Sequence, residues 1–287
     1  MNLTPRRERF RAILLGRECT HPASVFDPVS ARIAQDLGFG AGMFAGSIAS
    51  LAVLGAPDLT VVTLTEFAEQ VHRICRASDL PLLVDADHGF GNALSVKRTV
   101  EELETAGLAA LTIEDTLLPA PFGTPGTPQL ISIEEGVGKM RAALAGRQDP
   151  SLVIVGRTSA VAITGIEDAV ARLRAYERAG VDALFPVGVK TRAQLTAIAA
   201  AVNLPLIVGD AVGELNDLPF LTAARARVCL QGHQPFSAAV RAVYETMKAL
   251  RDGMDPSQLP HLASGDLMKQ VTRGSEYQGW IKEFLTA

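Results

Sequence analysis

The sequence predicts an α/β protein built on a (β/α)8, or TIM, barrel with a helical extension at its C-terminus. Eight short apolar runs alternate with longer segments whose apolar residues recur every three or four positions, as in amphipathic helices. The short runs are apolar at successive positions, which is typical of parallel strands buried on both faces. Eight such strand–helix pairs in about 250 residues favour a barrel.

The predicted elements alternate regularly along the chain. We expect strands at residues 22–26, 41–47, 80–87, 109–115, 152–158, 182–187, 204–210 and 227–232. Helical spacing fills the intervals, and Gly38, Gly107 and Gly180 stand where glycine commonly ends a helix. A doubly wound open sheet is the alternative, but no Gly-x-Gly-x-x-Gly turn follows the first strand, which weakens it.

No linker interrupts the chain, so we expect one domain over residues 1–287. The barrel is expected at about residues 20–252, and a helical tail that carries Trp280 at about 255–287. One long loop, residues 116–132, is rich in Pro and Gly. It is either a lid over the barrel mouth that turns at its glycines, or an ordinary surface loop.

Composition and charge exclude several classes of function. The 287 residues are 48% hydrophobic and carry a net charge of −4 without a basic run, so nucleic acid and anionic membranes are poor partners. No apolar stretch is long enough to span a membrane. Residues 1–20 predict a polar helix and not a signal peptide. Three widely spaced cysteines, Cys19, Cys75 and Cys229, favour a reducing cytoplasm, and the last two are expected to be core thiols.

Almost every predicted strand ends on a polar or charged residue. These residues are Asp27, Ser47, Asp85, Asp87, Glu114, Asp115, Arg157, Asp210 and His233. In a (β/α)8 barrel the C-terminal ends of the strands face the active site. One such residue alone can be a helix cap, as DPVSARIAQDLG indicates for Asp27. The whole set predicts a catalytic or binding site at the barrel mouth.

Three of these carboxylates predict a site for a hard divalent cation. Asp85 and Asp87 are two residues apart and point to the same face of one strand, and Glu114 ends the next strand. Carboxylates that converge repel one another unless a cation neutralises them. Oxygen ligands without a Cys or His cluster favour Mg2+ or Mn2+, and Mg2+ keeps several waters. The alternative is that these residues cap helices or pair with Arg and Lys.

Arg157 and two histidines complete the candidate set. Arg157 follows five apolar residues, so its charge needs a partner, either Glu114 or Asp115 or a carboxylate of the substrate. His233 lies just past the last strand, where it is either structural or an acid, base or substrate contact. His88 is expected to be structural, because Mg2+ prefers oxygen ligands.

Four segments in the order of the strands carry a family resemblance. They are AGMFAGS, VDADHGFGN, TIEDT and VGRTS. With them the chain resembles, over roughly residues 5–255, the phosphoenolpyruvate mutase/isocitrate lyase superfamily. The resemblance implies a (β/α)8 barrel that binds Mg2+ and an α-keto acid. It also implies a homotetramer, built as a dimer of dimers, with the eighth helix exchanged between neighbouring subunits.

The resemblance also implies a role for each acidic candidate. Asp85 would bind the metal directly, and Asp87 and Glu114 would hold metal-bound waters. Asp58, in the loop after the second strand, would support those waters. Ser47 and the backbone around it would bind the carboxylate and keto oxygens of the substrate.

Departures from the family pattern narrow the expected activity. Residues 116–132 contain neither Cys nor Lys, so the lid thiol of the isocitrate and methylisocitrate lyases is absent. Val187 stands where those lyases place a Glu. The Lys- and Asn-bearing lids of the mutases and phosphonopyruvate hydrolases are absent too. His233 after the eighth strand is in keeping with the oxaloacetate decarboxylase branch.

We therefore expect a Mg2+-dependent decarboxylase that converts oxaloacetate to pyruvate and CO2, with Mn2+ as an alternative metal. The metal would withdraw electrons from the C2 carbonyl, and Arg157 would take a carboxylate or stabilise the enolate oxygen. His233 would hold the departing carboxylate, or position or deliver a proton. The alternatives are a C–C bond lyase of a methylisocitrate- or dimethylmalate-like 2-hydroxy diacid, and a keto-acid-binding barrel without activity.

Overall fold

The computed structural model describes residues 3–124 and 126–286, and its centre is a sheet of eight parallel strands. The strands are β1 Ala23–Ser24, β2 Gly42–Phe44, β3 Leu82–Asp85, β4 Ala110–Glu114, β5 Val153–Thr158, β6 Ala183–Pro186, β7 Leu206–Val208 and β8 Ala226–Cys229. Each strand overlaps a predicted run. They pair in the order of the sequence, whereas the strand order of a doubly wound sheet reverses partway.

Residues just before β1 join the two ends of the sheet. Thr20 forms a parallel bridge with Val228 of β8. The Thr20 N–H donates to the Arg227 carbonyl at 3.0 Å, and the Thr20 carbonyl accepts from the Cys229 N–H at 2.9 Å. A sheet closed in this way gathers its strand ends into a ring. The predicted (β/α)8 barrel is confirmed, and the doubly wound alternative is excluded.

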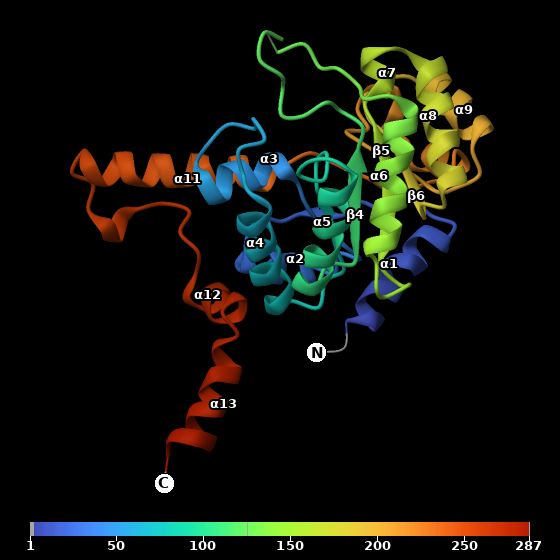
Figure 1. Cartoon of the computed structure of the whole chain (residues 1–287). Helices are drawn as coiled ribbons and strands as arrows, with labels where there is room; N and C mark the ends of the chain where they lie inside the picture. Colours follow the sequence, from blue (N-terminus) through green and yellow to red (C-terminus); the bar gives the residue numbers. More distant parts are fainter. Residues whose placement is uncertain (1–2, 125, 287) are drawn as a thin grey trace.

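Helices alternate with the strands along the chain, and others follow the last strand (Figure 1). They are α1 Thr4–Leu15, α2 Pro28–Asp36, α3 Gly46–Ala49, α4 Leu64–Ala77, α5 Ala93–Ala106, α6 Ile133–Gly146, α7 Ala160–Ile163, α8 Ile166–Ala179, α9 Arg192–Ala201, α10 Leu218–Ala223, α11 Gln234–Arg251, α12 Gly265–Val271 and α13 Gly274–Leu285. Gly107 ends α5 as predicted, with φ 105°. Asp27 caps α2, since its carboxylate accepts from the Ser30 N–H at 2.7 Å.

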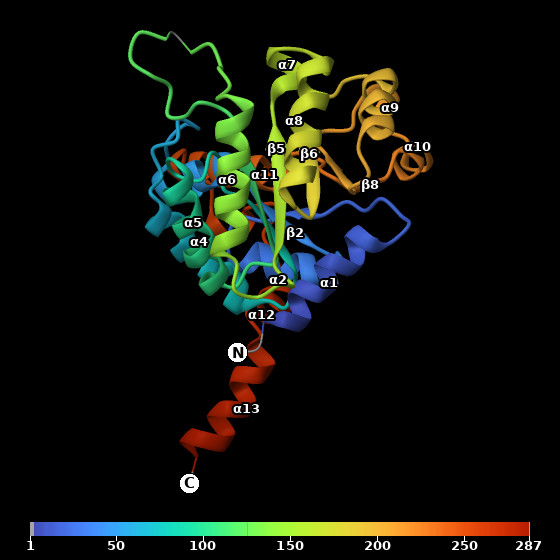
Figure 2. The ribbon, with the colours of Figure 1, turned by 45° about the vertical axis from the view of Figure 1, so that its right-hand side comes forward.

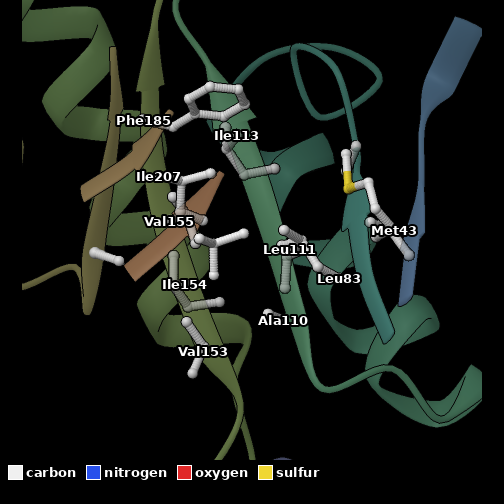
Figure 3. Packing of buried hydrophobic residues seen from close by; sticks show 14 of the residues in the cluster. Met43, Leu83, Ala110, Leu111, Ile113, Val153, Ile154, Val155, Phe185 and Ile207 are labelled. Carbon is white, nitrogen blue, oxygen red and sulfur yellow. The ribbon is translucent and has the colours of Figure 1, made fainter. Parts of the chain in front are cut away.

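Apolar side chains from neighbouring strands fill the barrel (Figure 3). Leu83 of β3, Leu111 of β4, Val155 of β5 and Ile207 of β7 are all fully buried. Burying an aliphatic side chain of this size stabilises the fold by about 1.5–3 kcal/mol. The barrel interior is thus a packed core and not a pore. A cavity at the strand ends is therefore closed at its base by buried side chains.

The C-terminal part of the chain leaves the barrel (Figures 1 and 2). None of the residues of α11 is buried. The chain returns at α12, where Arg273 pairs with Asp36 at 2.7 Å and Val271 is buried, and α13 then projects away from the body. The predicted helical extension is confirmed. Among the described residues, no helix combines the length and hydropathy that a membrane span requires.

Two glycines of α6 provide a matched test of helix packing. A Cβ on Gly146 would lie 2.5 Å from the Lys97 carbonyl oxygen of α5, whereas a Cβ on Gly138 would meet no described atom within 4 Å. We expect Gly146→Ala to lower the free energy of unfolding by about 1–3 kcal/mol, because the backbone must move. Gly138→Ala should leave it unchanged or raise it by up to about 1 kcal/mol. Urea denaturation measures both, and equal stabilities would contradict the close approach of α5 and α6.

Candidate active site

A cavity of about 310 Å3 lies at the C-terminal ends of the strands. It is lined by all seven residues predicted for the site, which are Ser47, Asp58, Asp85, Asp87, Glu114, Arg157 and His233. Asp210 also lines it, and Phe185, Val187 and Leu230 contribute apolar wall. The structure therefore brings together side chains that are spread over most of the chain.

Asp85, the last residue of β3, is held by three partners. The Thr112 hydroxyl of β4 donates to Asp85 Oδ1 at 2.9 Å, and the Asp87 N–H donates to the same oxygen at 3.2 Å. The other oxygen, Oδ2, forms an ion pair with the Arg157 guanidinium. These contacts fix the orientation of the carboxylate at the strand end.

Arg157 of β5 lies between two carboxylates. Besides its contact with Asp85, its Nε is 3.2 Å from Glu114 Oε2, an ion pair that lacks the alignment of a hydrogen bond. Its guanidinium carbon is 5.6 Å from the centre of the Phe185 ring. Burial would lower the Arg157 pKa, but the charges of Asp85 and Glu114 outweigh burial and raise it. The sequence left Glu114 and Asp115 open as partners of Arg157. The structure confirms Glu114, adds Asp85 and does not pair Arg157 with Asp115.

Asp87 is the most crowded of the carboxylates. Its backbone adopts φ 47°, in the left-handed region that is uncommon for residues other than glycine. Its side chain packs over Gly46, where a Cβ would lie 2.5 Å from Oδ1, so this approach requires a glycine. Burial and then the negative charges of Asp85 and Glu114 raise the Asp87 pKa well above its usual range. A cation beside the carboxylate would reverse that shift.

Glu114 at the end of β4 and Asp58 after β2 add to the same negative field. Burial raises the pKa of both carboxyl groups, and Arg157 opposes the rise at Glu114. The charge of Asp85 adds to the rise at Asp58. Among the described residues that line the cavity, Arg157 is the only arginine or lysine. With Asp85, Asp87 and Asp210, the cavity has five carboxylates and one guanidinium, and therefore a surplus of negative charge when the carboxylates are ionised.

The donor set fits a hard divalent cation. It offers carboxylate oxygens, and no cysteine is among the described residues that line the cavity. Within residues 3–124 and 126–286, no three side chains already converge as a complete set of direct ligands. Mg2+ retains several waters in proteins, so this arrangement suits an ion bound by one carboxylate directly and by the others through water.

His233, the residue before α11, lines the cavity and contacts β1. Its Nδ1 lies 2.8 Å from Ser24 Oγ. Burial lowers the His233 pKa, while the charges of Asp210 and Asp85 oppose that shift. The sequence reasoning missed Ser24, whose only signal is one hydroxyl within the apolar run PASVF.

Behind Glu114, Asp115 anchors a buried polar network and does not line the cavity. It accepts hydrogen bonds from the Tyr176 hydroxyl at 2.6 Å and from Arg172 at 3.0 Å. Arg172 also donates to the Ile131 carbonyl at 2.9 Å, at the end of the long loop. The network ties β4 to α8 and to the root of that loop. Sequence reasoning missed it, because contacts this distant along the chain leave no local pattern.

His88 lies outside the lining of the cavity and is 4% exposed. Burial and then the charge of Lys139 lower the His88 pKa to about 4. The Lys139 ammonium donates to the His88 carbonyl at 2.9 Å. A neutral, enclosed ring of this kind agrees with the structural role expected for it.

The Pro- and Gly-rich loop at residues 116–132 projects from the body of the molecule above α6 (Figure 2). Leu118 lines the active-site cavity, and a second cavity of about 230 Å3 lies between the loop and residues 58–60. Pro125, near the predicted turning points, lies outside the described residues. The position is that of a lid, and its closure stays a prediction.

The fold and the cavity together define a (β/α)8-barrel enzyme with an acidic site at its strand ends. Residues 10–251 match the protein family described as phosphoenolpyruvate phosphomutase. The chain belongs to this family. The resemblance inferred from its four motifs is thereby confirmed.

Individual relatives are similar over nearly the whole chain. An oxaloacetate decarboxylase of Rhodopseudomonas palustris (strain BisB18) is 62% identical over 275 residues, which are 96% of this chain and 95% of the relative. A phosphonopyruvate hydrolase solved with oxalate and Mg2+ has a TM-score of 0.85 and 28% identity, over 98% of this chain and 99% of that one. An oxaloacetate acetylhydrolase solved with 3,3-difluorooxaloacetate has a TM-score of 0.82 and 26% identity, over 96% of each chain.

Removing Arg172 tests the network behind the cavity. Arg172→Met keeps much of the side-chain volume but leaves Asp115 buried without its cationic partner. We expect it to lower the free energy of unfolding by about 3–5 kcal/mol, the usual cost of breaking a buried ion pair. Arg178→Met, at an exposed position of the same helix, should change it by less than about 0.5 kcal/mol. Urea denaturation compares them, and a loss below about 1 kcal/mol for Arg172→Met would refute the importance of the network.

Proposed function

We propose that this chain is an oxaloacetate decarboxylase, a carboxy-lyase that converts oxaloacetate to pyruvate and CO2 with a divalent cation. The observation that carries the proposal is Arg157, which is partly buried and paired with Asp85 and Glu114 in a cavity that also holds His233. The 62% identity to an oxaloacetate decarboxylase along 96% of the chain supports the choice of substrate. Decarboxylation requires groups that stabilise an enolate, and this cavity offers them.

The acidic side chains would hold the cation, which we propose to be Mg2+, with Mn2+ as the alternative. Asp85 would bind it directly, Asp87 and Glu114 would bind through water, and Asp58 would support those waters. The Mg2+ present in a solved phosphonopyruvate hydrolase of the same fold supports this choice. When bound, a divalent ion polarises the keto carbonyl of a substrate.

Ser47 and Arg157 would bind and orient the keto acid. Ser47 lines the cavity from α3, and its hydroxyl can donate to a carboxylate or keto oxygen. Arg157 would stabilise the negative charge that develops on the C2 oxygen as CO2 leaves. Because the carboxylates and Phe185 already hold the guanidinium in place, little reorganisation is needed when that charge appears.

His233 would act at the other end of the substrate. A ring N–H can donate a hydrogen bond to the C4 carboxylate before cleavage. After CO2 has left, the residue would position the group that protonates C3, or would itself deliver a proton after taking one up from water. Both roles require only that the ring borders the cavity, as it does.

Two other functions have less support. A lyase of a methylisocitrate- or dimethylmalate-like 2-hydroxy diacid needs a base at the lid, and residues 116–132 contain no Cys, Lys or His. A keto-acid-binding barrel without activity has no need for an arginine held between two carboxylates where enolate charge would develop. Decarboxylation uses all seven residues predicted for the site.

The direct assay offers oxaloacetate to the purified protein with Mg2+ and measures pyruvate. We expect turnover that a chelator abolishes and added Mg2+ restores. Arg157→Ala should lower kcat/KM by at least about a hundredfold, the size of the loss when one charge-stabilising donor is removed. Arg178→Ala, on the exposed side of α8, is the matched control and should retain normal turnover.

Three outcomes would count against the proposal. Faster turnover of a 2-hydroxy diacid than of oxaloacetate would favour the lyase. Unchanged turnover by Asp85→Ala in the presence of Mg2+ would remove the role given to the metal. Near-normal activity of Arg157→Ala would remove the role given to that arginine.

We further propose a homotetramer, a dimer of dimers, in which neighbouring subunits exchange the eighth helix of the barrel, α11. This helix presents one exposed apolar face. The face comprises Val240, Val243, Tyr244, Met247 and Leu250. An apolar groove of about 530 Å3, lined in part by Phe26, Ile33 and Phe39, runs beside β1 and α2. Helix α11 of a second copy suits this groove, because the eighth helix of a barrel covers the wall between its last and first strands.

Charges placed on the apolar face of α11 test the assembly. Val243→Glu combined with Met247→Glu should lower the molar mass measured by light scattering from that of a tetramer to that of a smaller species, because burying a carboxylate in an apolar groove is costly. Ala242→Glu, on the opposite side of the helix, should preserve the tetramer. A tetramer in the double variant would contradict the proposed role of this face.

The expected domain organisation and cellular location of the protein stay predictions. One is a single domain over residues 1–287. The other is a cytoplasmic location, which is supported by Cys19, Cys75 and Cys229, since all three are buried and free.

A further inference from the structure

Ser24 of β1 makes a contact that the proposed chemistry does not yet use. Its Oγ lies 2.8 Å from Nδ1 of His233, across 209 residues of sequence. The backbone next to Ser24 is held in the sheet, where the Val25 N–H donates to the Met43 carbonyl at 2.9 Å. Because the strand fixes the position of the hydroxyl, the contact restrains one side of the imidazole ring.

The two nitrogens of a neutral imidazole have different roles, since one donates and the other accepts. The partner of one nitrogen decides which of them carries the proton. The cavity beside His233 holds Asp85, Asp87 and Glu114 and would receive an anionic substrate. An Nε2–H turned toward this negative field is stabilised, whereas a bare Nε2 lone pair is repelled. A serine hydroxyl can rotate to donate to Nδ1 in that arrangement.

We propose that Ser24 is a positioning residue for His233: its hydroxyl donates to Nδ1 and keeps the imidazole proton on Nε2. The ring then presents an N–H donor to the distal carboxylate of a keto diacid. This inference rests on the proposed function and adds the residue that selects the tautomer. Ser24 lines the apolar groove and not the active-site cavity, so it reaches the substrate only through His233.

A double-mutant cycle separates this role from a structural one. Ser24→Ala, His233→Ala and the double variant are compared, with Mg2+, by kcat/KM for oxaloacetate and by Kd for 3,3-difluorooxaloacetate. We expect Ser24→Ala to lower kcat/KM by about tenfold and to weaken binding of the analogue when His233 is present. It should have no further effect in the His233→Ala background. Ser24→Thr, which keeps the hydroxyl, should restore kcat/KM to within about threefold.

Ser30→Ala is the matched control, because Ser30 also lines the groove and its hydroxyl accepts from the backbone N–H groups of Phe26 and Asp27. Its effect should be the same with and without His233. Equal losses from Ser24→Ala in both backgrounds would overturn the proposal. If the native protein forms no pyruvate, the proposed function fails. The role of Ser24 is then tested only by the double-mutant cycle measured as Kd for 3,3-difluorooxaloacetate. Coupling in Kd then supports the role of Ser24, and additivity overturns it.

Discussion

Five carboxylates cannot share one small cavity without positive charge, and the arrangement of this site follows from that constraint. Arg157 supplies one charge, and its partial burial between Asp85 and Glu114 strengthens each interaction because water screens it less. One guanidinium does not balance the cluster: burial and then the negative charges of Asp85 and Glu114 still raise the pKa of Asp87 well above its usual range. A divalent cation would complete the balance, and its charge would then also be available to a substrate.

The closed parallel sheet makes this concentration of charge tolerable. Glu114 of β4 is in register with Arg157 of β5, and Asp85 of β3 is in register with Thr112 of β4. The three charged side chains therefore stand at the ends of three consecutive strands, with backbone ladders below each of them. Underneath, the barrel is filled with buried aliphatic side chains (Figure 3). The apolar core stabilises the fold, while the strand ends carry groups that on their own destabilise it.

The sequence predicts features that depend on residues close together in the chain, and it misses contacts between residues that are far apart in the chain. Strand positions and the Asp27 cap are predictable, because periodicity and capping act over a few residues. The site residues are predictable as well, because a barrel gathers its strand ends wherever they lie in the chain. The contact of Ser24 with His233 is not, since it depends on how β1 and β8 meet. The expected strands are also longer than the observed ones. A strand ends where its neighbour stops pairing with it, which local sequence does not show. Strand β1, for example, has only two paired residues.

His233 stands where the barrel ends and α11 begins, and this position links the chemistry to the surface of the molecule. The residue lines the cavity, and the next one starts a helix with no buried residue. A helix that leaves the barrel at this point would rotate the imidazole with every change in its own direction, because one peptide bond separates them. Two contacts with the barrel resist that rotation. Phe236 in the first turn of α11 packs edge to face against Phe26, with the ring centres 5.3 Å apart. The Ser24 hydroxyl, which β1 fixes, meets the ring itself, so the sheet contributes directly to the placement of His233.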